Sequence, residues 1–375
     1  MHITLHLTTG CTMRCSYCYS PPLKRHDMPL EVIKKAIELS TTLAPQNTGI
    51  IFFGGEPLLR KDLIKQTIAI CREYESSHGY SYHFKVTTNG LLLDKPFLEY
   101  ANKERLHVAL SIDGTRKAHD YHRKEINGSS TYEMVLKKAE MLLAYQPYAY
   151  ALMVMTPETV AYYAESVEFL IERGFRYILA SLNYAGNWTD TTVKELKDQY
   201  RKIAKLYEKW TLAQKKFYLS PFEKKFASHV QGKDALCMQC HFGVKQISIA
   251  PDGSIYPCVQ YVKDPTSKEF SIGDVWNGID RERQMSLFRL SRSEQEECHA
   301  CALKDRCEHR CSCLNWQTTG SIDQISPFLC ETERVLIPIV DRLGERLYKK
   351  RAPLFIHKMY NTMYPLISYF EDSSY

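Results

Sequence analysis

The sequence lacks the features that would place a protein in a membrane or direct it out of the cell. No run of about 18 or more apolar residues occurs among its 375 residues, so we expect no transmembrane helix. The first residues, Met-His-Ile-Thr-Leu-His-Leu, have no basic segment followed by a long apolar core, which argues against a secretory signal. We therefore expect a cytoplasmic protein without a membrane partner.

The sequence also lacks a basic or aromatic module of the kind that binds nucleic acid, and it has no low-complexity segment or internal repeat. Its formal net charge of +6 is weak evidence for such a partner, because this value counts every cysteine as neutral. Cysteines that bind metal are negatively charged thiolates, which would offset most of the positive charge. We expect no nucleic-acid partner.

Cysteine is abundant, with 13 residues. Without an export signal, these cysteines are better explained as reduced metal ligands than as disulfides. Cys11, Cys15 and Cys18 fall close together, directly after an alternating apolar run, residues 2–8, that predicts a first strand. Three thiolates can hold one soft metal centre and leave one iron of a four-iron cluster open, whereas a structural zinc site needs four ligands. The triplet therefore predicts an iron–sulfur site.

Short apolar runs alternate with amphipathic stretches of helical length over the first half of the chain. This alternation is typical of β/α units around a parallel sheet. Six units can be counted, with strands expected at residues 2–8, 48–53, 81–87, 106–112, 148–155 and 177–182. Six units rather than eight predict a partial (β/α)6 TIM-like barrel of the α/β class, open on one side to a large substrate.

The spacing Cys-x3-Cys-x2-Cys, with Tyr17 before the last cysteine, resembles the signature of the radical S-adenosylmethionine (SAM) enzymes. The resemblance implies a [4Fe–4S] cluster on Cys11, Cys15 and Cys18, whose open iron is chelated by the amino and carboxylate groups of SAM. It also implies that one electron cleaves SAM to a 5′-deoxyadenosyl radical, which abstracts hydrogen from the substrate.

Further motifs follow the expected strands, at the rim where barrel loops carry the chemistry. Gly54-Gly55-Glu56 resembles the family motif that meets the amino group of SAM, and Arg123 suits its carboxylate. For Asp113 and Arg123 the alternative is a turn cap and a surface ion pair, and Asn-Gly at Asn89 is also an ordinary turn. The complete set expected to bind SAM is Tyr17, Gly54, Gly55, Glu56, Thr88, Asn89, Ser111, Asp113, Arg123 and Asn183.

A second group of cysteines resembles the SPASM domain, whose members carry two auxiliary [4Fe–4S] clusters, so that three clusters are implied in all. The resemblance assigns the outer auxiliary cluster to Cys298, Cys301, Cys307 and Cys330, and the inner one to Cys240, Cys258 and Cys311. Cys237 is the candidate for the fourth inner ligand, although it lies only three residues before Cys240; the alternative is an open coordination site. Cys313 is an alternative to Cys311, which the spacing favours.

Changes in composition along the chain predict four parts. They are a radical SAM partial barrel at residues 1–189, a helical bridge at 190–233, a SPASM domain at 234–335 and a helical C-terminal tail at 336–375. Cys71 lies in a predicted helix and is expected to be a small buried apolar residue rather than a ligand.

SPASM-type enzymes mostly modify peptides and proteins, so the resemblance implies crosslinking or oxidation of a peptide or protein substrate, as in RiPP-type peptide maturation. Many peptide maturases carry a leader-binding domain ahead of the barrel, whereas here strand one begins near residue 2. We therefore expect a leader peptide to be recognised by a separate protein or by the C-terminal tail, or to need no recognition. The resemblance also implies an electron donor such as flavodoxin or ferredoxin. The sequence identifies no catalytic base.

Three alternatives remain at this point, one of which is a SPASM enzyme that modifies a tetrapyrrole. An anaerobic sulfatase-maturating enzyme, which forms formylglycine, would have the same architecture, but we would then expect an acidic residue after the inner-cluster cysteine, where this chain has Val259. The alternative of a different class is a non-catalytic iron–sulfur electron carrier or scaffold. The cysteine triplet and the Gly-Gly-Glu motif argue against a carrier.

Overall fold

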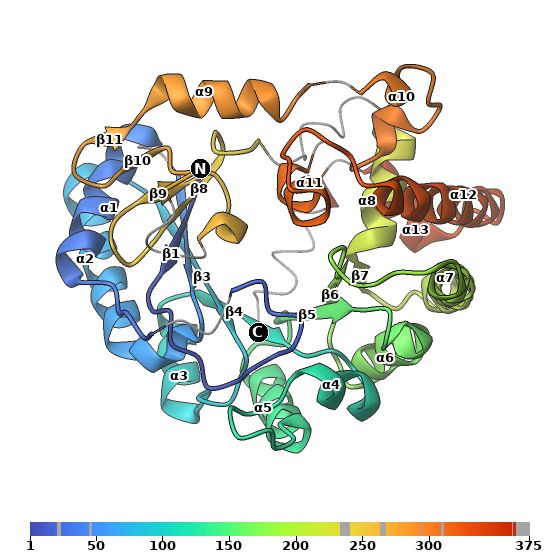
Figure 1. Ribbon diagram of the computed structural model, residues 1–375. Coiled ribbons are helices and arrows are strands. Elements are labelled where there is room, and N and C mark those ends of the chain that lie inside the picture. Colours follow the sequence, from blue (N-terminus) through green and yellow to red (C-terminus); the bar gives the residue numbers. More distant parts are fainter. Residues whose placement is uncertain are drawn as a thin grey trace. The chain divides into compact units, whose positions relative to one another are not determined.

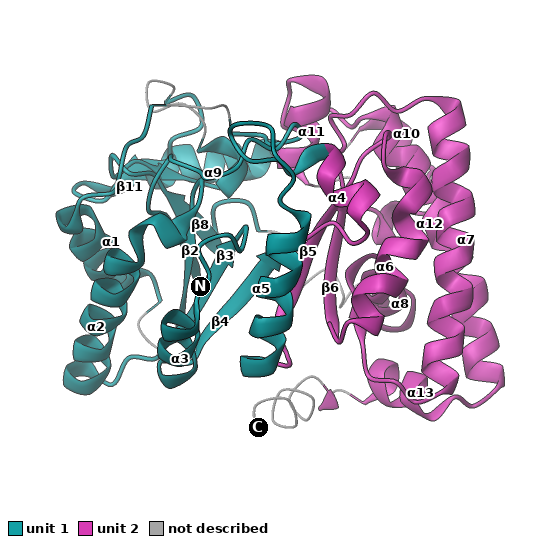
Figure 2. Cartoon of the chain, turned by 90° about the horizontal axis from the view of Figure 1, so that it is seen from below, with its two compact units in different colours: residues 1–111, 122–146, 240–293 teal, residues 112–121, 147–239, 294–375 magenta. Residues whose placement is uncertain are grey.

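The computed structural model describes residues 1–20, 24–44, 47–232, 241–262, 268–293, 295–308, 311–361 and 363–364. Its contacts divide the chain into two compact units (Figure 2). Unit 1 comprises residues 1–111, 122–146 and 240–293, and unit 2 comprises residues 112–121, 147–239 and 294–375.

Unit 1 is built around a mostly parallel sheet in which β1 has a neighbour on each side (Figure 1). Ile3 of β1 lies opposite Ile50 of β2 and Ile247 of β8, and all three side chains are completely buried. In order across the sheet the strands are β4 (Leu106–Ser111), β3 (Tyr82–Thr88), β2 (Thr48–Phe53), β1 (His2–His6), β8 (Gln246–Ile249) and the antiparallel β9 (Ile255–Tyr256).

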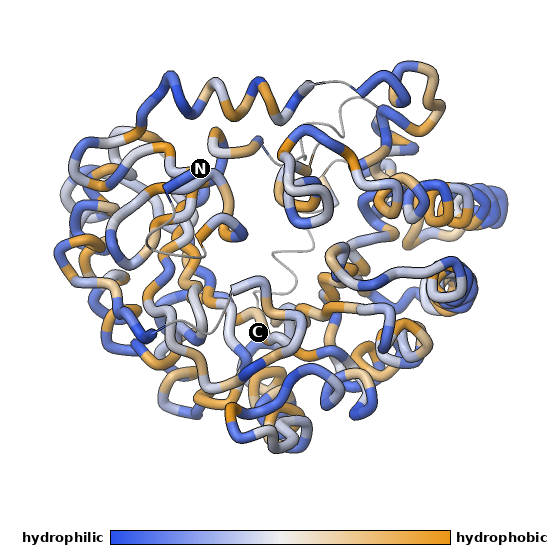
Figure 3. Tube along the Cα trace, viewed as in Figure 1, coloured by the Kyte–Doolittle hydropathy of each residue, from blue (hydrophilic) through white to orange (hydrophobic). Residues whose placement is uncertain are grey.

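Helix α1 covers the strands of unit 1 because it carries an apolar stripe. In α1, Val32, Ile33, Ala36 and Ile37 recur at helical spacing and are buried, and hydrophobic and hydrophilic residues alternate along the helix in Figure 3. The helices are α1 (Leu30–Leu43), η1 (Pro57–Arg60), α2 (Lys61–His78), α3 (Lys95–Lys103), α5 (Tyr132–Tyr145), η4 (Val259–Tyr261) and α9 (Arg281–Leu290), and a small hairpin is formed by β10 (Gly273–Asp274) and β11 (Gly278–Ile279).

Unit 2 contains three parallel strands and most of the C-terminal helices. The strands are β5 (Tyr150–Met155), β6 (Tyr177–Leu182) and β7 (Tyr218–Leu219). The long helices α7 (Asp190–Leu212) and α12 (Pro327–Lys349) pack together, and α12 also packs on α8 (Ser220–Gln231). The other helices are α4 (Arg116–His122), whose last residue belongs to unit 1, η2 (Val160–Tyr162), α6 (Tyr163–Glu172), α10 (Glu296–His299), η5 (Lys304–Arg306), α11 (Ser312–Thr319) and α13 (Pro353–Tyr360).

The predicted α/β class and all six predicted strands are confirmed, with ends that differ by at most two residues. The helical C-terminal region is also confirmed, in α12 and α13. Two features were not predicted. The short strand β7 pairs with β6, and β8, from the predicted SPASM segment, pairs in parallel with β1. The limits of the four predicted parts stay a prediction.

A buried ion pair joins α8 to α12 within unit 2. Nζ of Lys225 lies 2.7 Å from Oε2 of Glu333, and the two side chains are 4% and 6% exposed. Lys225→Met should leave a buried carboxylate without its cation and cost about 3 kcal/mol of unfolding free energy. Urea unfolding followed by circular dichroism measures this loss. Lys35→Met, which breaks an exposed pair with Glu38, is the matched control and should cost under about 1 kcal/mol; equal losses in the two variants would contradict the prediction.

Candidate functional site

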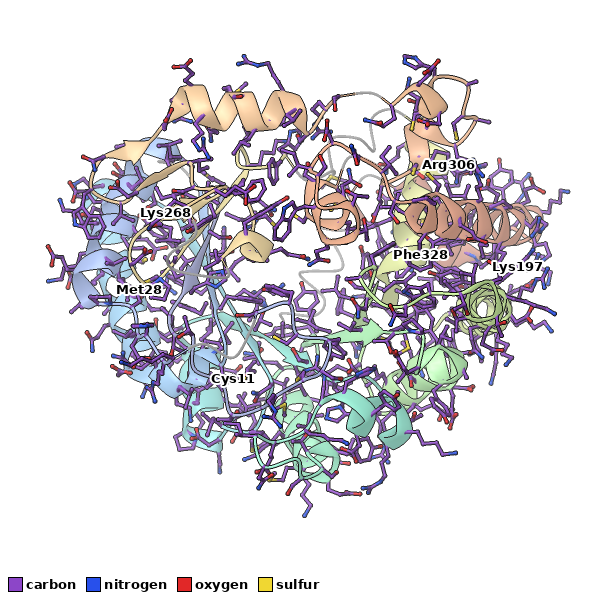
Figure 4. The ribbon with its side chains drawn as sticks, viewed as in Figure 1. Cys11, Met28, Lys197, Lys268, Arg306 and Phe328 are labelled. Atoms are coloured by element: carbon purple, nitrogen blue, oxygen red, sulfur yellow. The ribbon has the colours of Figure 1, made fainter. Side chains whose placement is uncertain are left out.

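The loop that follows β1 carries the first three cysteines, of which Cys11 is labelled in Figure 4. All three thiols are free of disulfide bonds. The backbone N–H of Met13 donates to Sγ of Cys11 at 3.4 Å, and the N–H of Cys18 donates to the carbonyl of Cys15 at 3.1 Å. These bonds close two tight turns, one at Cys11 and one between Cys15 and Cys18.

A second segment of unit 1, residues 122–125, holds this loop from outside. Oγ of Ser16 lies 2.6 Å from Nδ1 of His122, and the N–H of Ser16 donates to the His122 carbonyl at 3.3 Å. The Tyr17 ring lies 4.9 Å from the His122 ring and 5.4 Å from the guanidinium carbon of Arg123. Tyr17 and Arg123, both predicted to bind SAM, are thus brought together, and His122 has a structural role.

The glycine pair after β2 allows a very close approach to the start of the cysteine loop. A Cβ atom on Gly54 would lie 2.3 Å from the Thr8 carbonyl oxygen, and one on Gly55 would lie 2.2 Å from that of Gly10. Gly54 also has a φ of +125°, which side-chain-bearing residues rarely adopt. The N–H groups of Gly55 and Glu56 donate to the carbonyls of Thr8 and Gly10, both at 2.8 Å. The two glycines therefore fix Glu56 against the cysteine loop.

The Glu56 carboxylate is completely buried and accepts three hydrogen bonds. Oε1 accepts from the N–H of Leu58 at 3.0 Å and from Oγ1 of Thr88 at 2.7 Å, and Oε2 accepts from the N–H of Asn89 at 2.7 Å. Burial raises the pKa of Glu56 to about 7, although these three bonds oppose the shift. Within this network, Glu56 holds the end of β3 in place, and its contact with SAM stays a prediction.

Asn89 connects this network to the first cysteine. Its Nδ2 donates to Oγ1 of Thr12 at 2.9 Å and reaches Sγ of Cys11 at 3.7 Å, while its Oδ1 accepts from the N–H of Leu91 at 3.1 Å. Burial raises the pKa of Cys11, whereas the hydrogen bonds from Met13 and Asn89 lower it. Asn89 thus links the Gly-Gly-Glu motif to the cysteine triplet, because it donates to Glu56 through its backbone and to Cys11 through its side chain.

The donor set of this loop fits an iron–sulfur cluster better than a single metal ion. A structural zinc ion takes four protein ligands, whereas three thiolates can hold a four-iron cluster and leave one iron open. Three cysteines in one short loop, with an amide N–H directed at Cys11, suit the cluster. When bound, the cluster and SAM would supply a 5′-deoxyadenosyl radical.

The hydrogen bond from Asn89 to Cys11 can be tested directly. N–H donors to cluster sulfurs favour the reduced state, so Asn89→Ala should lower the reduction potential of the reconstituted cluster and slow SAM cleavage about tenfold at unchanged iron content. Redox titration followed by electron paramagnetic resonance, together with the rate of 5′-deoxyadenosine formation, measures both effects. Asn102→Ala removes a peripheral amide that donates to the Tyr145 carbonyl, and should change neither. An unchanged potential in Asn89→Ala would contradict the prediction.

Of the remaining residues predicted to bind SAM, Ser111 ends β4 in unit 1, and Asp113 and Asn183 belong to unit 2. Asp113 is completely buried, and its Oδ1 accepts a hydrogen bond from the N–H of Val154 at 2.9 Å, so it fastens its loop to β5. The carbonyl of Asn183 accepts from Nε1 of Trp188 at 2.7 Å, which orders the loop after β6. Roles of these residues in SAM binding stay predictions.

Three of the cysteines assigned to the outer auxiliary cluster lie close together in unit 2. Cys298 is in α10, Cys330 is in the first turn of α12, and the N–H of Cys301 donates to the Cys298 carbonyl at 3.2 Å. Burial raises the pKa of Cys330, and the nearby Cys298 and Cys301 thiols raise it further. Cys307, the fourth, is also buried in this unit.

The inner auxiliary cluster is less completely described. Cys258 is buried in unit 1, whereas Cys311 is in unit 2, where a hydrogen bond with Cys313 lowers the pKa of Cys311. Cys237 and Cys240 lie outside the described residues. The ligands of this cluster therefore stay a prediction. Cys71 is buried in α2, away from both groups in the sequence.

Comparison with known proteins agrees with both cysteine groups. Residues 5–170 match the radical SAM superfamily, and residues 229–302 match the iron–sulfur cluster-binding domain SPASM. A cysteine-type anaerobic sulfatase-maturating enzyme of Clostridium perfringens is 23% identical over 325 residues, which cover 81% of this chain and 86% of the relative. A serine-type anaerobic sulfatase-maturating enzyme of Klebsiella aerogenes is 22% identical over 317 residues, covering 80% of this chain and 77% of the relative.

Solved structures show the same fold. The enzyme anSMEcpe with bound AdoMet superposes with a TM-score of 0.79 at 20% identity, over 92% of this chain and 98% of that protein. Streptococcus suis SuiB, bound to the precursor peptide SuiA, has a TM-score of 0.60 at 16% identity, over 88% of this chain and 75% of SuiB. The chain is therefore a radical SAM enzyme with a SPASM domain, whose cofactors are SAM and [4Fe–4S] clusters.

Proposed function

We propose that this enzyme oxidises a cysteine or serine side chain of a peptide or protein substrate to formylglycine, as an anaerobic sulfatase maturase does. The observation that carries the proposal is the hydrogen-bonded network in unit 1 that joins Cys11, Glu56 and Asn89, because it supports the proposed binding of a cluster and SAM by these residues. The substrate class is supported by relatives of both the cysteine and the serine type, each of which matches about four-fifths of the chain.

Oxidation is favoured over the crosslinking of RiPP-type peptides because the similarity to sulfatase-maturating enzymes is found in the sequence as well as in the fold. The sulfatase-maturating relatives align over both the radical SAM and the SPASM segments of the sequence. SuiB, whose structure includes a precursor peptide, is similar in fold, and its TM-score of 0.60 is below the 0.79 of anSMEcpe. Modification of a precursor peptide is the second candidate, because SuiB was solved with such a peptide bound.

The proposed oxidation removes two electrons from the substrate side chain. The carbon that bears the thiol or hydroxyl would lose one hydrogen atom, for which bound SAM would supply the acceptor. It would then lose one further electron, for which clusters held by the SPASM segment would be the candidate acceptors, and the thiol or hydroxyl would lose a proton. A serine gives the aldehyde directly, whereas a cysteine gives a thioaldehyde that water hydrolyses to the aldehyde and hydrogen sulfide.

The proposed reaction needs a base that accepts the proton of the thiol or hydroxyl. Val259, at the start of η4 and directly after Cys258, has no atom that can take a proton. The base is therefore unassigned in the proposal, and it lies elsewhere than at this position.

The proposed function also implies partners and a location for the enzyme. We infer a flavodoxin or ferredoxin as electron donor, a separate protein for recognition of any leader peptide, and a cytoplasmic site of action. Within the part of the chain that the structure describes, no helix is both long enough and apolar enough to cross a bilayer.

The proposal is tested with the anaerobically reconstituted enzyme, SAM, a reductant and three versions of a sulfatase peptide, with cysteine, serine or alanine at the position to be modified. We expect 5′-deoxyadenosine in all reactions, and by mass spectrometry an aldehyde in the cysteine or serine peptide but not in the alanine peptide. Formation of 5′-deoxyadenosine with all three peptides unmodified would reject the sulfatase-maturase function while leaving SAM cleavage intact.

A further inference from the structure

Unit 1 contains a cavity of about 350 Å³ beside the loops that are predicted to hold SAM. One wall is formed by Gly54 and Gly55, which directly precede Glu56. A second wall is formed by Tyr19 and Ser20, which directly follow the last cysteine of the triplet. Ala250, at the end of β8, contributes a third wall. The cavity is of the size that usually accommodates a small organic ligand or a short piece of peptide.

His6 presents an unsatisfied polar atom to this cavity. The side chain extends from the end of β1, lines the cavity together with Thr8 and is only 5% exposed. The two residues are two apart in an extended segment and so face the same side of the sheet. Within the described residues, Nε2 of His6 has no hydrogen-bond partner. Burying a polar atom without a hydrogen-bond partner costs free energy. A ligand that supplies this partner therefore binds more tightly.

The acidic groups in the cavity wall are already neutralised by cations. Asp27 is bound by Arg25, with Nε to Oδ1 at 3.0 Å, and by Arg60 at 3.1 Å, and Oγ1 of Thr8 donates to Oδ1 of Asp27 at 2.6 Å. These partners lower the pKa of Asp27 to about 2, the hydrogen bond from Arg25 most of all. The carboxylate thus keeps its charge and its cations throughout the physiological range.

The second carboxylate in the wall is paired in the same way. Asp252 lies 2.6 Å from Nζ of Lys268, which is labelled in Figure 4, and accepts from the N–H of Ser254 at 3.0 Å. His6 itself is uncharged, because burial lowers its pKa to about 3. Among the described wall residues, Asp27, Asp252 and His6 therefore offer no free countercharge to a charged ligand, which would lose its hydration beside them.

We propose that this cavity binds an uncharged segment of the peptide substrate, and that Nε2 of His6 forms a hydrogen bond with a neutral hydroxyl, thiol or amide group of that segment. The inference rests on the proposed function, because it takes the substrate to be a peptide. His6 is a specificity-determining residue here. It is poorly suited to be the missing base, since a side chain that stays neutral to low pH takes up a proton only weakly.

The test measures binding to the reconstituted enzyme saturated with SAM. The probes are three blocked tripeptides, acetylated and amidated, with serine, aspartate or lysine between two alanines. Affinities are measured by saturation-transfer nuclear magnetic resonance. The variants are His6→Phe, which keeps a ring to pack on Phe53 but removes both nitrogens, His6→Gln, which keeps a polar group, and Ala250→Trp, which fills the cavity. His83→Phe, on the exposed part of β3, is the matched control.

We expect the serine tripeptide to bind more tightly than the charged ones. His6→Phe should weaken its binding about tenfold, His6→Gln should restore part of it, and Ala250→Trp should abolish it. No binding of the serine tripeptide, equal binding of the three probes, or binding unchanged in both His6→Phe and Ala250→Trp would each overturn the proposal. SAM cleavage without peptide should be the same in His83→Phe as in the wild type. A wild type that does not cleave SAM would count against the proposed function rather than against the role of His6.

Discussion

Replacing Cys11, Cys15 and Cys18 together by alanine is expected to abolish the formation of 5′-deoxyadenosine from SAM. The reconstituted wild type should hold about twelve irons, in three four-iron clusters, and the variant about eight. The reason is that the three cysteines form no disulfide bonds and all lie in the loop after β1, the predicted site of the cluster that cleaves SAM. Iron and sulfide analysis and chromatography of the reaction products measure both effects.

Cys71→Ala is the matched control for this experiment. Cys71 is also a free cysteine of unit 1, but it is completely buried in α2, where burial raises the pKa of its thiol. A buried thiol of this kind is an apolar side chain, so the substitution should lower stability by about 1 kcal/mol and leave iron content and SAM cleavage unchanged. A wild type with eight irons or fewer, or a triple variant that still cleaves SAM, would contradict the assignment.

Much of the fold follows from local pattern, and the parts that were missed depend on distant contacts. The β/α alternation is a local signal, and it placed all six barrel strands. Strand β8 has only four residues, and what makes it part of the sheet is its pairing with β1, so that Ile247 lies beside Ile3. Strand β7 has two residues and pairs with β6. Residues 244–250 have the pattern of a short strand, but local periodicity does not reveal which strand such a short segment pairs with.

The site residues divide in the same way. Some are identified by motifs of neighbouring residues, and others only by contacts between segments that are distant in the sequence. The cysteine triplet and Gly54-Gly55-Glu56 are recognisable from spacing alone, because their chemistry depends on consecutive residues. The function of Glu56 as an acceptor for Thr88 and Asn89 depends on two strands meeting, which no spacing reveals. His6 was missed altogether, since a histidine in an alternating run is an ordinary strand residue until its burial and its unpartnered Nε2 are seen.

Glu56→Ala is expected to abolish SAM binding and to destabilise unit 1. The substitution leaves the N–H groups of Leu58 and Asn89 and the hydroxyl of Thr88 without their acceptor in a buried site. At about 1–3 kcal/mol for each unsatisfied donor, we expect a loss of at least about 3 kcal/mol of unfolding free energy. Glu56→Gln keeps the shape and one acceptor oxygen and should lose less, about 1–2 kcal/mol. Equal losses in the two variants would show that the hydrogen bonds are not the cause.

The ionisation of Glu56 should also make the stability of the protein depend on pH. The pKa is about 7 in the folded protein, raised by burial from an ordinary value of 4.5, so the folded state holds the proton more tightly than the unfolded state. The resulting stabilisation is complete below pH 4.5 and is lost as the pH rises through 7. Between pH 6 and pH 8 the wild type should therefore lose about 1 kcal/mol more than Glu56→Gln, which does not titrate. Urea unfolding of the reconstituted proteins at the two pH values measures the difference. A difference of zero would mean that the three donors keep the folded carboxylate ionised at pH 6, and that their hydrogen bonds outweigh the cost of burial.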